Sequence, residues 1–339
     1  MPSEKNMILD AEAALAAQKA HAAVVDEFLG PEKQPSNLVG MGYGVKWTDG
    51  VPTGKPALLA LVTQKVDLED LPKTDRIPKK INGMQTDVLA VGELFADQAE
   101  PIEAGIEALA RRARPASGGY SVGHRSITAG TIGTCVYDRL GTPGNPSGIP
   151  SRYYILSNNH VLANSNNARP GDPILQPGPF DGGVDPSDRI ATLNRFVRIT
   201  FDPPTPRSLH RNLVDAAVAT GEFHDLKREI HWVGHLRGWL PRTRVNVGMP
   251  VQKTGRTTSY TTGRITVVGA TVDVNYGRSG IARFRDQIIT TPMSAGGDSG
   301  STVADRNNMA VGLLFAGSTR ATILNQIQHV RTLLDIEIA

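Results

Sequence analysis

From residue 120 onward the chain repeats one pattern, a short run of apolar and β-branched residues followed by glycine or proline. Val, Ile and Thr favour extended backbone, whereas Gly and Pro favour turns, so each run is a candidate strand. Short strands at this spacing predict an all-β sandwich or barrel. The runs cover residues 130–137, 152–157, 190–201, 213–219, 245–253, 263–275, 284–291 and 310–316. Residues 322–335 follow, with Ile323, Ile327, Val330 and Leu334 spaced as one face of a closing amphipathic helix.

The first 96 residues predict a separate, small α+β unit. Residues 3–29 are rich in alanine, with Ser3 as a candidate N-cap and Gly30-Pro31 as a stop signal, which predicts a helix. Strand-like runs follow at 38–47, 57–66 and 84–94. One helix on a small sheet makes a compact unit of normal domain size.

Residues 97–119 predict an exposed linker between two domains. A short helical stretch, 102–110, leads into the basic residues Arg111, Arg112 and Arg114 and then into a segment rich in Pro, Ser and Gly. We therefore expect domains at 1–96 and 120–339. The N-terminal domain is interpreted either as a removable regulatory or pro-domain or as a permanent assembly domain, and the sequence leaves a homo-oligomer through this domain open.

The hexapeptide Gly296-Gly297-Asp298-Ser299-Gly300-Ser301 predicts a reactive serine. Glycines on both sides allow a tight turn and leave the hydroxyl of Ser299 uncrowded. The same turn can aim the N–H groups of Gly297 and Ser299 at one point, where they would stabilise an oxyanion. An ordinary glycine-rich turn is the alternative interpretation.

A serine nucleophile needs an imidazole base and, usually, a carboxylate that orients it. His160 is the candidate base because it ends a β-rich run in polar turn formers. Asp215 is the candidate carboxylate because it is the single acid inside an apolar run, where an unpaired charge is costly. The competing aspartates lie among Pro and Gly in evident loops, at positions 172, 181, 185, 188 and 202.

Three motifs together resemble the chymotrypsin/trypsin superfamily of serine endopeptidases. They are Asn158-Asn159-His160-Val161, Leu213-Val214-Asp215-Ala216-Ala217 and Gly297-Asp298-Ser299-Gly300-Ser301, in the order His, Asp, Ser. Asn-Asn precedes the histidine where the superfamily usually has Ala-Ala, and Gly-Ser follows the serine where it has Gly-Gly. With one cysteine the chain looks more like the bacterial trypsin-like peptidases than like disulfide-bonded animal members.

The resemblance covers roughly residues 120 to 335 and implies a double β-barrel with six strands in each barrel. It implies that His160 is the general base, Asp215 its orienter and Ser299 the nucleophile. It also implies a primary specificity pocket with Met293 and Ser294 at the floor and Ala316 and Gly317 at the walls. The full fold expectation is a mainly β protein, a chymotrypsin-like double β-barrel preceded by the small α+β domain. No metal or organic cofactor is implied.

Two other chemistries fit the sequence poorly. An α/β-hydrolase needs Gly-x-Ser-x-Gly, but position 301 is serine. A zinc site at His224, His231 and His235 has metalloprotease spacing without the glutamate that would activate water. An interfacial or core patch around Trp232, Val233 and Trp239 is the simpler interpretation there.

Composition narrows the function classes further. With 40% hydrophobic and 20% charged residues, the chain is expected to fold around a core. Charged residues interrupt the N-terminal apolar stretches, and no apolar run approaches the length of about 20 residues that a membrane helix needs. We therefore expect a cytoplasmic protein with no membrane partner. The net charge is only +3 and no aromatic-interleaved basic patch appears, so no nucleic-acid partner is expected.

The sequence thus predicts a serine endopeptidase acting on a protein or peptide substrate through an acyl-enzyme. A serine esterase with the same three residues and a catalytically idle binding module are the alternatives. Since positions 293, 294, 316 and 317 hold no carboxylate, we expect a small or medium apolar side chain at the substrate position P1. Arg320 lies close in sequence, and an acidic P1 residue is the alternative expectation.

Overall fold

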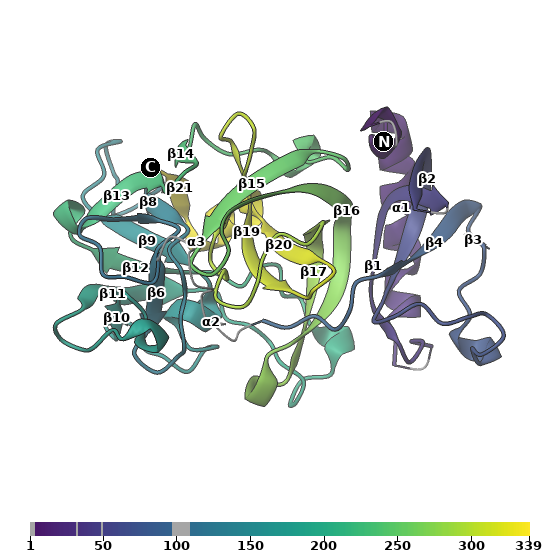
Figure 1. Cartoon of the computed structure of the whole chain (residues 1–339), viewed down its shortest axis with the longest axis horizontal. Coiled ribbons are helices and arrows are strands. Elements are labelled where there is room, and N and C mark those ends of the chain that lie inside the picture. Colours follow the sequence, from purple (N-terminus) through teal and green to yellow (C-terminus); the bar gives the residue numbers. More distant parts are fainter. Residues whose placement is uncertain (1–3, 32, 49, 97–108) are drawn as a thin grey trace.

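The computed structural model describes residues 4–31, 33–48, 50–96 and 109–339. Two large β-sheets form most of the molecule, and the N-terminal elements extend one of them at its side (Figure 1). The prediction of a mainly β fold preceded by a small α+β unit is confirmed.

The first large sheet has eight strands in the order β21-β8-β9-β12-β11-β10-β6-β7. β7 and β8 stand near opposite ends of this order, yet only two residues separate them in the chain, so the sheet curls back on itself. Its strands are β6 (Ser121–His124), β7 (Gly130–Thr131), β8 (Thr134–Asp138), β9 (Tyr153–Ser157), β10 (Pro173–Leu175), β11 (Arg189–Phe196), β12 (Ala217–Gly221) and β21 (Ile336–Ile338). A small sheet lies beside it, made of β5 (Ala116–Gly118), β13 (Leu226–Ile230) and β14 (Gly234–His235).

The second large sheet contains a closed ring of six strands. The order β15-β18-β19-β20-β17-β16 is closed by a further pairing of β15 with β16, which agrees with the six-stranded barrel that the resemblance implied. The strands are β15 (Pro250–Gly255), β16 (Ser259–Asn275), β17 (Ile281–Thr290), β18 (Thr302–Asp305), β19 (Ala310–Gly317) and β20 (Thr322–Gln326).

The N-terminal strands continue this second sheet. β1 pairs antiparallel with β16, and the order then runs β1-β2-β4-β3 (Figure 1). The two main chains approach closely, because a Cβ at Gly40 would lie 2.5 Å from the carbonyl oxygen of Thr271. These strands are β1 (Leu38–Thr48), β2 (Val51–Val62), β3 (Lys80–Ile81) and β4 (Met84–Ala90). The predicted division at 97–119 stays a prediction, and the sheet itself crosses from one proposed domain to the other.

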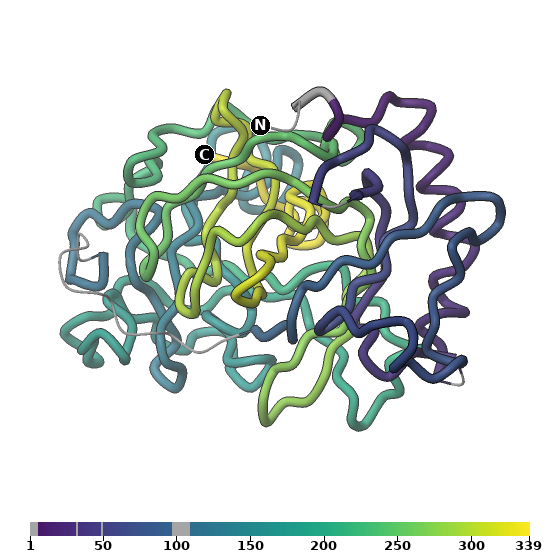
Figure 2. Tube along the Cα trace, turned by 45° about the vertical axis from the view of Figure 1, so that its right-hand side comes forward, coloured from purple at the N-terminus to yellow at the C-terminus, as the bar shows by residue number. Residues whose placement is uncertain are grey.

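Helix α1 (Ala11–Phe28) packs on β1 and β2, on the side of the molecule away from the eight-stranded sheet (Figures 1 and 2). Its N-cap is Asp10, whose carboxylate accepts a hydrogen bond from the N–H of Ala13 at 2.8 Å, so the helix begins later than predicted. The proposed cap, Ser3, lies outside the described residues.

The closing helix α3 is shorter than predicted. It covers only Ile327–Leu334, and residues 322–326 form β20 instead. The remaining helices are short: α2 (Asn159–Leu162), and single 3₁₀ turns at Glu4–Met7, Lys73–Asp75, Pro179–Asp181, Arg207–Leu209, Phe223–Asp225, Arg242–Arg244 and Gly277–Ser279.

The described part of the linker region is more buried than an exposed joint. Leu109 is fully buried, and the Arg114 side chain is only 16% exposed. Arg114 donates to the carbonyl of Asp188 at 3.2 Å, which explains its burial. Arg112 does lie at the surface, 56% exposed. The predicted helical stretch at 102–110 falls mostly outside the described residues.

Candidate active site

His160 and Asp215 meet because the strands that carry them are neighbours. His160 lies in α2, directly after β9, and Asp215 lies two residues before β12. β9 and β12 pair antiparallel with Ser157 opposite Ala217, so the end of one strand faces the start of the other. The sequence therefore places both side chains at one corner of the eight-stranded sheet.

The two side chains form a buried hydrogen-bonded pair. His160 Nδ1 lies 2.5 Å from Asp215 Oδ2, and the N–H of His160 donates to Oδ1 at 3.1 Å. An ionised carboxylate only accepts hydrogen bonds, so Nδ1 carries the proton, and in the neutral ring Nε2 is the nitrogen without one. His160 is 2% exposed and Asp215 is fully buried.

Polar side chains from the neighbourhood of both large sheets hold Asp215 in place. The hydroxyl of Tyr276, which follows β16, donates to Oδ2 at 2.8 Å. The N–H of Asp215 donates to Asn325 Oδ1 at 2.9 Å, and Asn158 Nδ2 donates to its carbonyl at 2.7 Å. These three residues were not predicted as site residues. Tyr276 directly follows β16 and Asn325 lies in β20, both far from Asp215 in the sequence, so no local motif indicates either of them.

Ser299 lies in the loop between β17 and β18, in the six-stranded ring, and is 6% exposed. Gly297 has φ +97° and Gly300 has φ +96°, conformations that favour glycine. A Cβ at Gly300 would lie 2.1 Å from Ser157 Oγ, so the loop also needs glycine there for close packing. Among the residues that the structure describes, the N–H groups of Gly297 and Ser299 donate to no acceptor. Both donors are therefore available to a ligand.

Main-chain contacts bring the serine loop beside the histidine segment. Thr131, in β7, donates its N–H to the carbonyl of Ser299 at 2.8 Å and its hydroxyl to the carbonyl of Gly297 at 2.8 Å. Gly130 lies between the two segments, because a Cβ there would be 2.4 Å from Val161 Cγ2 and 3.0 Å from the carbonyl oxygen of Ser299. Val161 directly follows His160, so the two segments face each other across a single glycine.

A buried ion pair anchors the residue before Ser299. Lys253 Nζ lies 3.0 Å from Asp298 Oδ2, and both side chains are fully buried. Asp298 also accepts the N–H of Thr257 at 2.8 Å and of Ala295 at 3.1 Å. Desolvation lowers the pKa of Lys253, and the Asp298 carboxylate opposes that change. Asp298 belonged to the predicted motif, but its partner Lys253 was missed because it lies 45 residues away in β15.

A second buried cation lies close to the same loop. Arg256 forms an ion pair with Asp181, in which its Nε lies 2.8 Å from Oδ2. A Cβ at Gly297 would lie 3.3 Å from Arg256 Nη1, so the guanidinium packs against this glycine. Asp181 lies between β10 and β11 of the first large sheet, and Arg256 directly follows β15 of the second, so the pair also links the two sheets.

The four proposed pocket residues separate into two groups. Ser294 and Gly317 lie together, since a Cβ at Gly317 would be 3.4 Å from Ser294 Oγ. Met293 and Ala316 are buried in the apolar cores of the ring, where Met293 packs against Gly263. The hydroxyl of Ser294 lies 2.7 Å from that of Thr322, a further polar group at this end of the ring.

The histidines considered for zinc have other neighbours. His235 lies 3.8 Å from Glu229, and the ring of His231 packs edge-on against Tyr120. His224 is largely exposed. Within the described ranges, no three or more His, Cys, Asp or Glu side chains are grouped closely enough to hold a metal ion. In the same ranges no helix has the length and apolar character needed to cross a bilayer.

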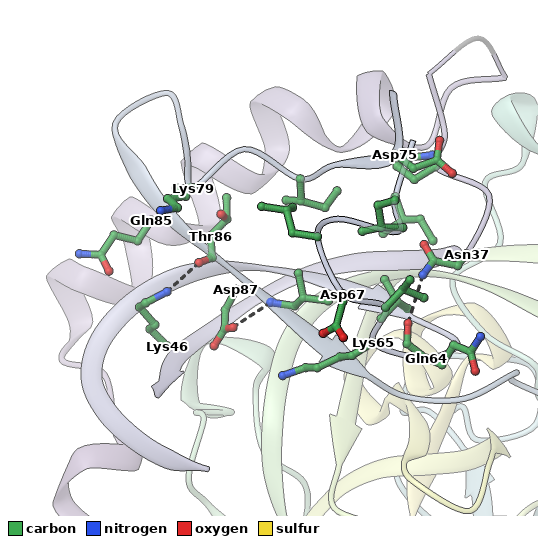
Figure 3. A pocket seen from close by; sticks show the side chains of 18 of the residues that line it. Asn37, Lys46, Gln64, Lys65, Asp67, Asp75, Lys79, Gln85, Thr86 and Asp87 are labelled. Carbon is green, nitrogen blue, oxygen red and sulfur yellow. Dashed lines mark hydrogen bonds between the residues drawn. The ribbon is translucent and has the colours of Figure 1, made fainter. Parts of the chain in front are cut away.

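A cavity of about 640 Å³ lies apart from this site, in the N-terminal unit (Figure 3). It is lined by β4, by the chain between β2 and β3, and by residues of β1 and just before it. Lys46 Nζ donates to the carbonyl of Thr86 at its side at 3.0 Å. None of the predicted site residues lines it.

No family model matches the chain, and no curated protein matches it in sequence. Solved structures do resemble it. Protease A of Thermobifida fusca is 15% identical, with a TM-score of 0.44 over 66% of this chain and 97% of that one. A Nocardiopsis protease is 16% identical over the same shares, again with a TM-score of 0.44. A glutamic acid specific serine protease is 17% identical, covering 66% of this chain and all of its own, with a TM-score of 0.44. In structure the chain is similar to several bacterial serine proteases of the chymotrypsin/trypsin type.

Proposed function

We propose that the protein is a serine endopeptidase with Ser299 as nucleophile, His160 as general base and Asp215 as orienter. The observation that carries the proposal is the buried pair of His160 Nδ1 and Asp215 Oδ2 at 2.5 Å, set beside the loop that holds Ser299. A carboxylate on Nδ1 fixes the tautomer in which Nε2 can accept a proton. An imidazole buried only for packing does not need such a partner.

In the proposed reaction, Ser299 Oγ attacks the carbonyl carbon of the scissile bond while His160 Nε2 accepts the hydroxyl proton. The N–H groups of Gly297 and Ser299 stabilise the tetrahedral oxyanion. His160 then gives the proton to the leaving amine, and an acyl group stays on Ser299. Water, deprotonated by the same imidazole, releases the acid and restores the hydroxyl. Asp215 stabilises the imidazolium in both steps.

A fluorophosphonate probe tests the nucleophile directly. Phosphonylation of Ser299, located by peptide mass spectrometry, is the expected result, and Ser299→Ala should prevent it. Ser126→Ala changes an exposed serine that is distant from Ser299 in the sequence. This variant serves as the matched control and should label like the unaltered protein. Absence of labelling in folded protein would exclude an activated serine and leave a binding module.

Peptide cleavage then decides between the two enzyme classes. Turnover of amide bonds in a mixture of unstructured peptides, lost in Ser299→Ala, is the expected outcome. Turnover of small acyl esters alone, with no amide cleavage at high enzyme concentration, would contradict the endopeptidase and support an esterase.

A further inference from the structure

One edge of β19 pairs with the serine loop at Leu314 and continues beyond it. β20 pairs with β19 along its other side. On the side facing away from β20, the N–H of Leu314 donates to the carbonyl of Ser301 at 3.0 Å, and its carbonyl accepts the N–H of Gly300 at 2.8 Å. The edge of β19 beyond Leu314 is therefore the strand edge that begins at the nucleophile loop.

The chain's own residues 94–96 occupy that edge. The N–H of Gly317 donates to the carbonyl of Phe95 at 3.0 Å, and the N–H of Phe95 donates to the carbonyl of Gly317 at 3.1 Å. On the opposite side, Asn275 donates to the carbonyl of Leu94 at 2.9 Å and accepts the N–H of Ala96 at 3.1 Å. The three residues thus form a short strand between the ends of β19 and β16. They lie about 10 Å along β19 from Leu314, at a rise of about 3.3 Å per residue.

Side chains fix this short strand from one face only. Leu94 and Ala96 are buried in the core cluster that also contains Tyr276, whereas Phe95 points outward and is 44% exposed. Ser318 adds a hydrogen bond from its hydroxyl to the carbonyl of Val91. The main-chain pairing at Gly317 is consequently supported by the buried side chains of Leu94 and Ala96 and not by the Phe95 side chain.

Extended peptides bind sheet edges by main-chain pairing of this kind. We propose that residues 94–96 act as a built-in competitor, which occupies the part of β19 that an extended substrate of Ser299 would pair with. This inference rests on the proposed function. A long peptide has to displace the pairing at Gly317, whereas a small acyl group reaches Ser299 without it. The segment therefore slows the reaction of Ser299 with extended peptides and leaves its reaction with small reagents unchanged.

The first test compares two reagents that phosphonylate Ser299. Diisopropyl fluorophosphate has no peptide backbone, and a tetra-alanyl diphenyl phosphonate has one. Phe95→Pro removes the N–H that donates to Gly317, and Phe95→Ala is the matched control that keeps it. We expect Phe95→Pro to speed labelling by the peptide reagent about two- to tenfold, the worth of one hydrogen bond, and labelling by the small reagent to stay within about twofold. Equal effects on both reagents, or no effect on either, would overturn the proposal.

Amide hydrogen exchange tests it in the unaltered chain, where no substitution can disturb folding. In the adduct with the peptide reagent, the Phe95 amide should exchange at least about tenfold faster, and in the small adduct it should not change. Unchanged protection of Phe95 in the peptide adduct would contradict the proposal while the labelling of Ser299 still stood. Failure of the small reagent to label Ser299 would instead remove the proposed function.

Discussion

Lys253 and Asp298 form an ion pair of 3.0 Å from which solvent is fully excluded, and Asp298 directly precedes the proposed nucleophile, Ser299. Charges that are buried together stabilise a structure only while both are present. The pair therefore ties the geometry of the serine loop to a side chain in β15, and this dependence can be measured.

Lys253→Met should reduce the free energy of unfolding by about 3–5 kcal/mol, because it leaves the Asp298 carboxylate buried and unpaired. Peptidase activity should fall as well, since the hydrogen bonds of Asp298 fix the loop that contains Gly297 and Ser299. Denaturant unfolding and a kcat measurement check both effects. The control is Lys227→Met, an exposed lysine, which should change neither. A loss of less than about 1 kcal/mol in Lys253→Met would show that the pair does not support the loop.

Substitution of the three proposed triad residues should abolish turnover. Ser299→Ala and His160→Ala should each reduce kcat by about 10⁴-fold or more, and Asp215→Asn should reduce it severely, because the three residues act as a unit. The double variant Ser299→Ala/His160→Ala should be little worse than either single variant. Normal turnover by folded Ser299→Ala protein would rule out the mechanism.

Tyr276→Phe should lower kcat about 10- to 100-fold with KM little changed. The hydroxyl of Tyr276 donates to Asp215 Oδ2 at 2.8 Å, and hydrogen bonds to charged groups are among the stronger ones in proteins. The change leaves the ring in the core, so the fold should persist. Tyr260→Phe removes an exposed hydroxyl that bonds to Gln252 and should leave kcat unchanged. A KM effect without a kcat effect would place Tyr276 in substrate binding instead.

Stability should fall on acidification through His21, in helix α1. Burial lowers the pKa of His21 from 6.5 to about 4, so between these values the unfolded chain binds more protons than the folded one. Stability is therefore lost as pH falls from 6.5 toward 4, by at most about 3 kcal/mol from this group. His21→Gln should flatten the pH dependence of the unfolding free energy, whereas the exposed His224→Gln should not. Identical slopes in all three proteins would contradict this assignment.

A peptide library varied at P1 should be cleaved after small or medium apolar residues. No carboxylate stands at positions 293, 294, 316 or 317, so a Lys or Arg side chain would enter without a counter-charge. Ser294→Asp should raise cleavage after Lys and Arg, because Ser294 lies beside Gly317. Dominant cleavage after Lys or Arg by the unaltered protein would show that the pocket assignment is wrong.

Local motifs were enough to name His160, Asp215 and Ser299 as candidates, since each stands in a short, distinctive sequence, and their catalytic roles stay predictions. Tyr276, Lys253 and Asn325 reach the site only through the closure of the six-stranded ring. Pairing between strands that are far apart in the chain produces no recognisable motif, so these residues could not be predicted from the sequence.

The end of the chain shows how tertiary pairing overrides a periodic pattern. Ile323 fits the helical face predicted for 322–335, but its backbone pairs with β17 on one side and β19 on the other. Those hydrogen bonds complete the ring, and only residues 327–334 remain helical. The late start of α1 has a local cause, because Asp10 accepts from Ala13 and caps the helix there.

The pairing of β1 with β16 means that the N-terminal unit covers a strand edge of the ring. β1 covers β16 between Val267 and Val272, in a strand of 17 residues. If residues 1–96 were removed, this stretch would present unpaired N–H and C=O groups on a long apolar strand, the kind of edge along which chains aggregate. A shortened chain would then stay dispersed only if another strand took the place of β1. Release of the N-terminal unit would be a change of assembly as much as a change of activity.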